Sequence, residues 1–250
     1  MSQGSYNQNM YNEDFYAPTD LFAAAADAQE RSTFITKTYS YLFGAVCALI
    51  AIEVVLFNTV NTSAITQIMM GGQISWLIVL GLFMAVSWIA NSWALNSTSS
   101  AMQHAGLVLY IVAQSIILMP LLCITFVVLG PEQGLQTIQS AGLATGGLFA
   151  LMTFAVFITR KDFSFLRSFL VFGSLAALGF IFVAILFGFS IGPIFMYAMI
   201  ALMCGYILYD TSNVMHHYRT TQYVAASLAL FASVVLLFWY VLQLFLSNRD

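Results

Sequence analysis

Charged side chains are scarce in this chain. Only 7% of its 250 residues are Asp, Glu, Lys or Arg, against roughly 25% in a typical soluble domain, while 61% are apolar. The mean hydropathy is +0.89. This shortage of charge excludes a chain built of soluble domains and predicts an all-α, polytopic membrane protein. At about 20 apolar residues per helix, the length leaves room for about six to eight spans.

Basic residues and cysteines are also few. Seven Lys and Arg give a formal net charge of −3, and they form no patch that neutralises phosphates, so we expect no nucleic-acid partner. The three cysteines, Cys47, Cys123 and Cys204, lie in apolar runs at spacings that match no zinc motif. We interpret them as small hydrophobic residues, and we expect no metal site and no cofactor.

Two sequence motifs of common enzymes are missing as well. The chain has no His-Glu-x-x-His sequence and no Walker sequence. An intramembrane protease would need paired aspartates or a buried Ser and His, whereas the apolar runs hold one Asp, with His104 at the mouth of one run. We therefore expect that the protein is not an enzyme.

The N-terminal segment differs from the rest of the chain. Residues 1–37 contain five acids, many Ser, Asn and Gln, and no basic region followed by a cleavage site, so we expect no removed secretory signal. This composition does not bury enough apolar surface to order itself. We interpret residues 1–37 as a flexible acidic cytoplasmic tail and residues 38–250 as one transmembrane domain.

Apolar runs recur through the transmembrane domain and predict a bundle of seven helices. We place these spans at Thr38–Thr59, Ile74–Leu95, His104–Leu129, Ile138–Ile158, Phe165–Phe187, Ile191–Tyr209 and Val224–Leu246. Pro120 predicts a kink in the third span. Small residues spaced for close helix contact occur at Gly81/Ala85, Gly142/Gly146 and Gly173/Ala177.

The positions of Lys and Arg predict the orientation of this bundle. With seven spans, six basic residues fall on one face and Arg249 alone falls on the other. Because cytoplasmic loops carry an excess of Lys and Arg, we expect the N-terminus in the cytoplasm and the C-terminus outside. The six are Arg31, Lys37, Arg160, Lys161, Arg167 and Arg219.

Two acids lie in or at the end of apolar runs, and they are the candidate ion- or pH-sensing residues. Glu53 lies about 22 Å into the first span, where it is either a protonated or interface-level group or part of a hydrated internal site. Asp210 ends the sixth span near its cytoplasmic end. His216 and His217 follow, but adjacent histidines point to different sides of a helix, so we interpret them as surface residues, not metal ligands.

Three segments resemble the bacterial YccA-like branch of the Bax inhibitor family. They are ITRKDFSFL at 158–166, GYILYDTSNVMHH at 205–217, and the final span that ends in SNRD at 247–250. The resemblance is best from about residue 138 to the end. Its motif positions here are Tyr209, Asp210, Thr211, Ser212, Asn213 and Ser233.

The resemblance implies two functions from different classes. YccA-like members bind an FtsH-type membrane AAA protease, together with its membrane cofactors, and modulate the degradation of other membrane proteins. They are themselves engaged through a flexible cytosolic tail. Other members of the family are pH-sensitive calcium leak channels, gated by an aspartate pair on the sixth and seventh helices that an arginine on the second helix latches.

Two departures from the leak-channel pattern weaken the case for a leak channel. The seventh-helix aspartate position is Ser233, and the second span contains no Lys or Arg. One carboxylate has no partner with which to share a proton. We therefore expect a modulator of an FtsH-type protease in the bacterial inner membrane, with a calcium leak channel as the alternative.

Overall fold

The computed structural model describes residues 21–59, 73–96, 99–189 and 192–247. Within these ranges, apart from one isolated bridge, the regular elements are all helices, and six are long and apolar enough to cross a membrane. The all-helical membrane fold predicted from composition is confirmed. Residues 1–20 of the predicted tail, and Arg249, lie outside the described residues. The helices are α1 (Ala28–Thr59), α3 (Gln73–Ala94), α4 (Ser100–Thr159), α5 (Leu166–Phe187), α6 (Pro193–His216) and α7 (Tyr223–Ser247).

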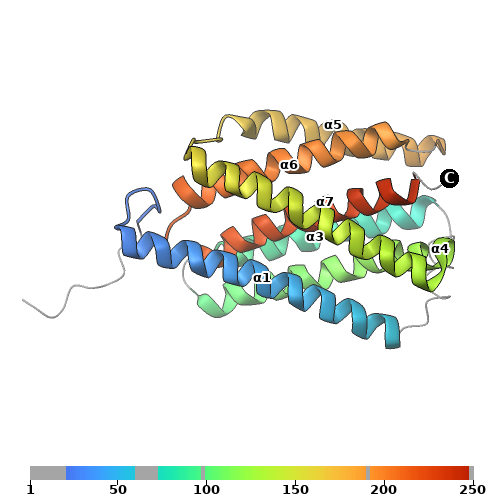
Figure 1. Ribbon diagram of the computed structural model, residues 1–250, viewed down its shortest axis with the longest axis horizontal. Coiled ribbons are helices and arrows are strands. Elements are labelled where there is room, and N and C mark those ends of the chain that lie inside the picture. The colour runs from blue at the N-terminus through green and yellow to red at the C-terminus, as the bar shows by residue number, and fades with distance from the viewer. Residues whose placement is uncertain (1–20, 60–72, 97–98, 190–191, 248–250) are drawn as a thin grey trace, which may run out of the picture.

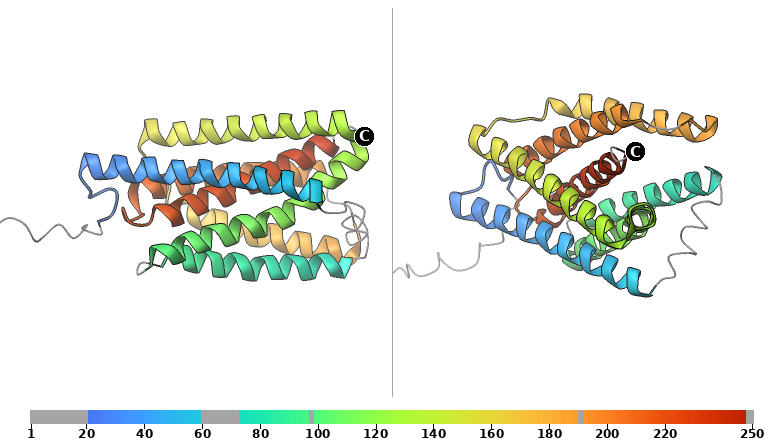
Figure 2. Two further views of the ribbon diagram at one scale, coloured as in Figure 1. Left: turned by 90° about the horizontal axis from the view of Figure 1, so that it is seen from below. Right: turned by 45° about the vertical axis from the view of Figure 1, so that its right-hand side comes forward.

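The predicted third and fourth spans form one element, α4, which has 60 residues. A straight helix of that length would measure about 90 Å, about three times the hydrocarbon thickness of a bilayer. Gly130 breaks the helix with φ 76° and ψ 175°, a conformation that glycine adopts without steric cost, and Pro131 starts the second arm. The two arms run in opposite directions (Figure 2). Pro120 keeps helical dihedral angles, so the reversal is at Gly130 and not at the predicted kink.

Two helices are longer than their apolar runs suggest. α1 begins at Ala28 and not at Thr38, because Asp27 caps it by accepting the backbone N–H of Glu30 at 2.7 Å. Residues 28–37 are therefore helical and not part of a loose tail. α6 continues past Tyr209 to His216, because its last polar residues find partners on neighbouring segments.

α7 lies in the middle of the bundle (Figures 1 and 2). In the most apolar 18-residue stretch of α7, 67% of the residues are buried inside the protein, against 17% in the corresponding stretch of α5 at the edge. Phe231 and Leu237 of α7 are fully buried, whereas Phe169 and Phe172 of α5 are 71% and 72% exposed. α5 therefore presents its apolar surface to lipid, and α7 is the helix on which α1, α3, α4 and α6 pack.

Glycines set the closest helix contacts. A Cβ at Gly173 would lie 2.9 Å from the Leu202 side chain, so this predicted small-residue position does bring α5 close to α6. Gly81, Gly142 and Gly146 have no atom within 4 Å of such a Cβ, so these predicted packing positions make no close contact within the described part of the chain.

Gly106 permits the approach of α4 to α3, and its substitution tests this packing. A Cβ there would lie 2.5 Å from the Ala90 carbonyl oxygen and 2.8 Å from the Ala94 nitrogen, both of them backbone atoms. We expect Gly106→Ala to destabilise the fold by about 1–3 kcal/mol, since the two backbones must move apart. Gly142→Ala is the matched control, because its open position leaves only the gain in helix propensity of up to about 1 kcal/mol.

The measurement is thermal unfolding of the detergent-solubilised protein, followed as loss of the monodisperse gel-filtration peak. A Gly106→Ala protein as stable as the Gly142→Ala protein would contradict the close approach of α3 and α4.

Candidate functional site

Asp210 lies inside the bundle, on the last two turns of α6. It is 7% exposed, and its Oδ2 accepts a 2.7 Å hydrogen bond from the Ser233 hydroxyl of α7. The structure thus brings together the two positions that the sequence paired by resemblance. Neither α6 nor α7 contains another Asp or Glu, and α3 contains no Lys or Arg. A single carboxylate, held by a neutral hydroxyl, occupies this helix contact.

The residue after Asp210, Thr211, belongs to a group of three hydroxyls from different helices. Thr211 is fully buried, and its hydroxyl faces that of Tyr39 from α1, which also faces Thr153 of α4. None of the three oxygens makes a hydrogen bond of normal geometry within the described residues. Three helices, α1, α4 and α6, therefore meet at this small polar cluster.

The two motif segments at 158–166 and 205–217 contact each other through Ser212. The backbone N–H of Phe163 donates to the Ser212 Oγ at 2.9 Å. The Ser212 hydroxyl in turn donates to Asp162 Oδ1 at 3.4 Å. The other oxygen of Asp162 lies 3.1 Å from His217 Nε2. The α4–α5 connection is thereby fastened to the end of α6.

Asp162 organises this connection. Its Oδ1 accepts the backbone N–H of Ser164 at 2.8 Å, and this bond is the largest cause that lowers the pKa of the Asp162 carboxyl below its ordinary value. The contact with His217 lowers the pKa further. The two side chains are 44% and 49% exposed, so solvent screens their attraction and the hydrogen bonds do more to hold the turn.

The remaining predicted positions have structural roles. Tyr209 packs against the core, and the Asn213 carbonyl closes the end of α6 by accepting the N–H groups of His217 and Tyr218 at 2.8 and 3.0 Å. His216 Nδ1 lies 3.0 Å from the carbonyl oxygen of Ser212. Across the described part of the chain, no group of three His, Cys, Asp or Glu side chains is placed to hold a metal ion.

Glu53 does not join Asp210. It lies near the other end of the bundle, on the last two turns of α1, with Cys123 of α4 beside it. The side chain is 6% exposed, and neither of its oxygens has a hydrogen-bond partner among the described residues. Glu53 is thus buried between α1 and α4, and the choice between a protonated or interface-level group and a hydrated internal site stays a prediction.

Sequence reasoning missed the Asp162 contacts. One signal for them exists: Asp-Phe-Ser is a pattern in which an Asp side chain accepts the N–H two residues later and forms a turn. The partners on α6 lie about 50 residues away in the chain, and no local pattern indicates them. The cluster of Tyr39, Thr153 and Thr211 has no sequence signal, since isolated hydroxyls are common in these helices.

Substitution of Ser212 tests the link between the two motif segments. Ser212→Ala removes the acceptor of the Phe163 N–H, and we expect the 160–165 connection to open about fivefold more often, as the loss of about 1 kcal/mol implies. Arg160 and Lys161 make the opening measurable as the rate of limited trypsin cleavage. Ser168→Ala is the control, since that side chain is exposed. Equal cleavage rates in both variants would contradict the link.

Comparisons with known proteins agree with the membrane fold. A family model described as "Inhibitor of apoptosis-promoting Bax1" matches residues 31–250. Protein LIFEGUARD 4 of Arabidopsis thaliana is 33% identical over 118 residues, which are 45% of this chain and 47% of that protein. Bax inhibitor 1 of Schizosaccharomyces pombe is 34% identical over 122 residues, 46% and 45% of the two chains. An uncharacterized membrane protein of Vibrio cholerae is 28% identical over 123 residues, 48% and 54%.

The matched stretches thus span about half the length of these curated relatives. No solved structure matches the chain significantly.

Proposed function

This chain belongs to the Bax inhibitor family of multi-pass membrane proteins, and we propose that it binds an FtsH-type membrane AAA protease and modulates the degradation of other membrane proteins. The proposal takes the two arms of α4 as separate crossings, which makes seven. It places the protein in a bacterial inner membrane with the N-terminus in the cytoplasm, and it assigns no catalytic activity to the chain itself.

The observation that carries the proposal is the closed contact between Asp210 and Ser233. A carboxylate pair that shares a proton and an arginine that latches it are the parts a pH-sensitive gate needs, as the resemblance describes it. Here the second carboxylate is replaced by a hydroxyl that donates to the first at 2.7 Å, and the helix expected to carry the arginine has none. The interior therefore supports a structural bundle better than a gated pore.

The N-terminal segment is attached to the bundle in a way that suits engagement by a protease. We call residues 1–20, which the protease would grip, the handle. Residues 21–27 pack against the α6–α7 connection: the Ala23 N–H donates to the Tyr218 carbonyl at 2.9 Å, and the Thr220 N–H donates to the Leu21 carbonyl at 3.0 Å. The Thr220 hydroxyl also donates to Glu30 at 2.8 Å. A protease that pulls on residues 1–20 meets this attachment before it meets the bundle.

An open small-residue face supports lateral binding of a partner helix. Gly142 and Gly146 lie on the second arm of α4, and neither has an atom within 4 Å of the place where a Cβ would stand. Small residues at this spacing let two helix backbones approach closely in lipid. We propose that the face of α4 that contains Gly142 and Gly146 contacts the protease or its membrane cofactors.

Deletion of residues 1–20 tests the handle. This deletion leaves the attachment at 21–27 and the cap at Asp27 intact, so the fold is preserved. We expect the half-life of the protein to increase severalfold in cells that contain the protease, because an AAA protease needs an unstructured end to engage. The half-life is measured by blocking synthesis and following the protein by immunoblot.

A variant with residues 1–20 in shuffled order is the matched control, and we expect it to keep the short half-life, since length and composition are unchanged. The same lifetime for the deletion and the unmodified protein would count against the handle. So would a lifetime increase of equal size in cells that lack the protease.

The alternative function, a calcium leak, is tested at Asp210. We expect the purified protein in liposomes to show no calcium flux that depends on Asp210, because that carboxylate is buried and bonded to Ser233. Flux is read from a calcium dye inside the vesicles at several external pH values, for the unmodified protein, Asp210→Asn and Ser233→Asp. A pH-dependent flux in the unmodified protein that Asp210→Asn abolishes would favour the leak channel.

A further inference from the structure

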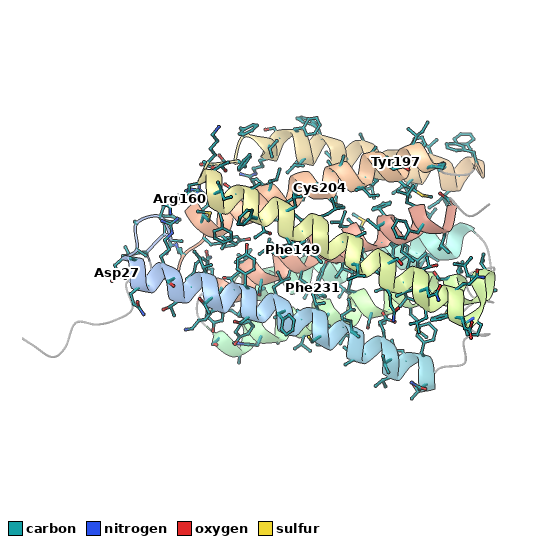
Figure 3. The ribbon with its side chains drawn as sticks, in the orientation of Figure 1. Asp27, Phe149, Arg160, Tyr197, Cys204 and Phe231 are labelled. Atoms are coloured by element: carbon teal, nitrogen blue, oxygen red, sulfur yellow. The ribbon has the colours of Figure 1, made fainter. Side chains whose placement is uncertain are left out.

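A cavity of about 540 Å³ lies at the end of the bundle where six of the seven basic residues gather. Its wall combines two guanidinium groups, two hydroxyls and an apolar floor. The residues that define it are Arg31, Ser32 and Thr36 of α1, Phe157 and Arg160 at the end of α4, and Met215 of α6. Figure 3 shows Arg160 at the same end of the molecule as Asp27, the cap of α1.

Among the described residues, no carboxylate balances the positive charge on this cavity. Neither Arg31 nor Arg160 makes an ion pair or a hydrogen bond through its guanidinium within the described residues, and the cavity wall contains no carboxylate. The nearby acids are committed elsewhere: Asp27 caps α1, Glu30 accepts from Thr220, and Asp162 is bonded within its own connection. Arg31 and Arg160, from two different helices, therefore line one space in which no described carboxylate pairs with them.

We propose that this cavity binds a phosphate ester through Arg31 and Arg160. The planar guanidinium matches the oxygen geometry of phosphate and bonds it in a bidentate manner. The hydroxyls of Ser32 and Thr36 supply further donors, and Phe157 and Met215 give the apolar contact that a bare inorganic ion does not use. A lipid headgroup and a soluble phosphate are two sources of the same chemistry.

The location and the size of the cavity suit a phospholipid headgroup. α1 has 32 residues and is about 48 Å long, longer than the roughly 30 Å hydrocarbon layer, so its first turns project to headgroup level. Basic pockets between transmembrane helices on the cytoplasmic side are places where anionic headgroups bind. The volume is many times the roughly 30 Å³ of one water and leaves space for a glycerol unit beside the phosphate.

An anion bound in this cavity would also help to hold the N-terminal segment in place. Ala26 and Ala28 follow Leu21 and Ala23, the residues bonded to the α6–α7 connection, and form part of the cavity wall. An anion held by Arg31 and Arg160 therefore joins α1 and α4 next to this attachment. The phosphate site stands on these residues alone and does not depend on the protease proposal.

The test is thermal unfolding of the full chain in a neutral detergent, with and without added anions. The probes are phosphatidylglycerol and phosphatidylcholine at equal mole ratio, and glycerol 3-phosphate against chloride at equal ionic strength. We expect phosphatidylglycerol to raise the melting temperature and phosphatidylcholine to leave it unchanged. The variant Arg31→Gln with Arg160→Gln is expected to require about tenfold more lipid for the same rise, since two charge-assisted contacts are lost.

The matched control is Lys161→Gln with Arg167→Gln, which removes two positive charges at the same end but outside the cavity. It is expected to respond as the unmodified protein does. If the double arginine variant does not fold, Arg160→Lys replaces it, because that change keeps the charge, loses the bidentate geometry and is expected to weaken the response severalfold.

A response to phosphatidylglycerol alone identifies a lipid ligand, and an equal response to glycerol 3-phosphate identifies a soluble one. The same loss of response in the control and in the arginine variant would overturn the proposal, because the effect would then be one of surface charge. Absence of any response to both anions in the unmodified protein would overturn it as well.

Discussion

A carboxylate in the interior of a membrane bundle requires a partner, and the packing of α6 on α7 supplies one for Asp210. Ser233 donates to it at 2.7 Å from the helix that is buried most deeply. This bond fixes which faces of α6 and α7 meet. Near the end of α6, Ser212 contacts the α4–α5 connection. The polar contacts of α6 therefore hold α4, α5, α6 and α7 together at one end of the bundle.

Polar groups are distributed unequally between the two ends, and this inequality favours protease modulation over a calcium leak. The end with Arg31, Arg160 and Arg219 holds the N-terminal attachment, the Asp162 turn and the basic cavity. Toward the other end, Glu53 lies between α1 and α4 without a hydrogen-bond partner among the described residues. Glu53 and Asp210 lie in opposite halves and share no contact, so the described helices do not arrange them as a carboxylate pair. The N-terminal attachment, the Asp162 turn and the basic cavity thus share one end of the bundle, whereas the open face of Gly142 and Gly146 lies along the second arm of α4.

The sequence predicts the helices well where one physical signal dominates. Apolar runs of about 20 residues place α3, α5 and α7 to within one residue or so at each end, because the length of the hydrocarbon layer sets them. The prediction fails where a polar contact overrides hydropathy: Asp27 starts α1 early, and Ser212 with Asn213 extends α6 beyond its apolar run. The family resemblance predicts that Asp210 and Ser233 face each other, whereas only the fold shows which residues contact Asp162.

The N-terminal attachment connects the proposed handle to the proposed anion site. Leu21 and Ala23 are held by backbone bonds to the α6–α7 connection, and Ala26 and Ala28 form part of the cavity wall beside Arg31. A pull on residues 1–20 acts first on those bonds, and then on the cap at Asp27 and the first turn of α1. An anion that joins Arg31 to Arg160 ties that turn to α4, so it adds resistance at the point where extraction would begin. If both proposals hold, the phosphate content of the membrane surface would set how readily a protease draws in the chain, with no change in the contact between Asp210 and Ser233.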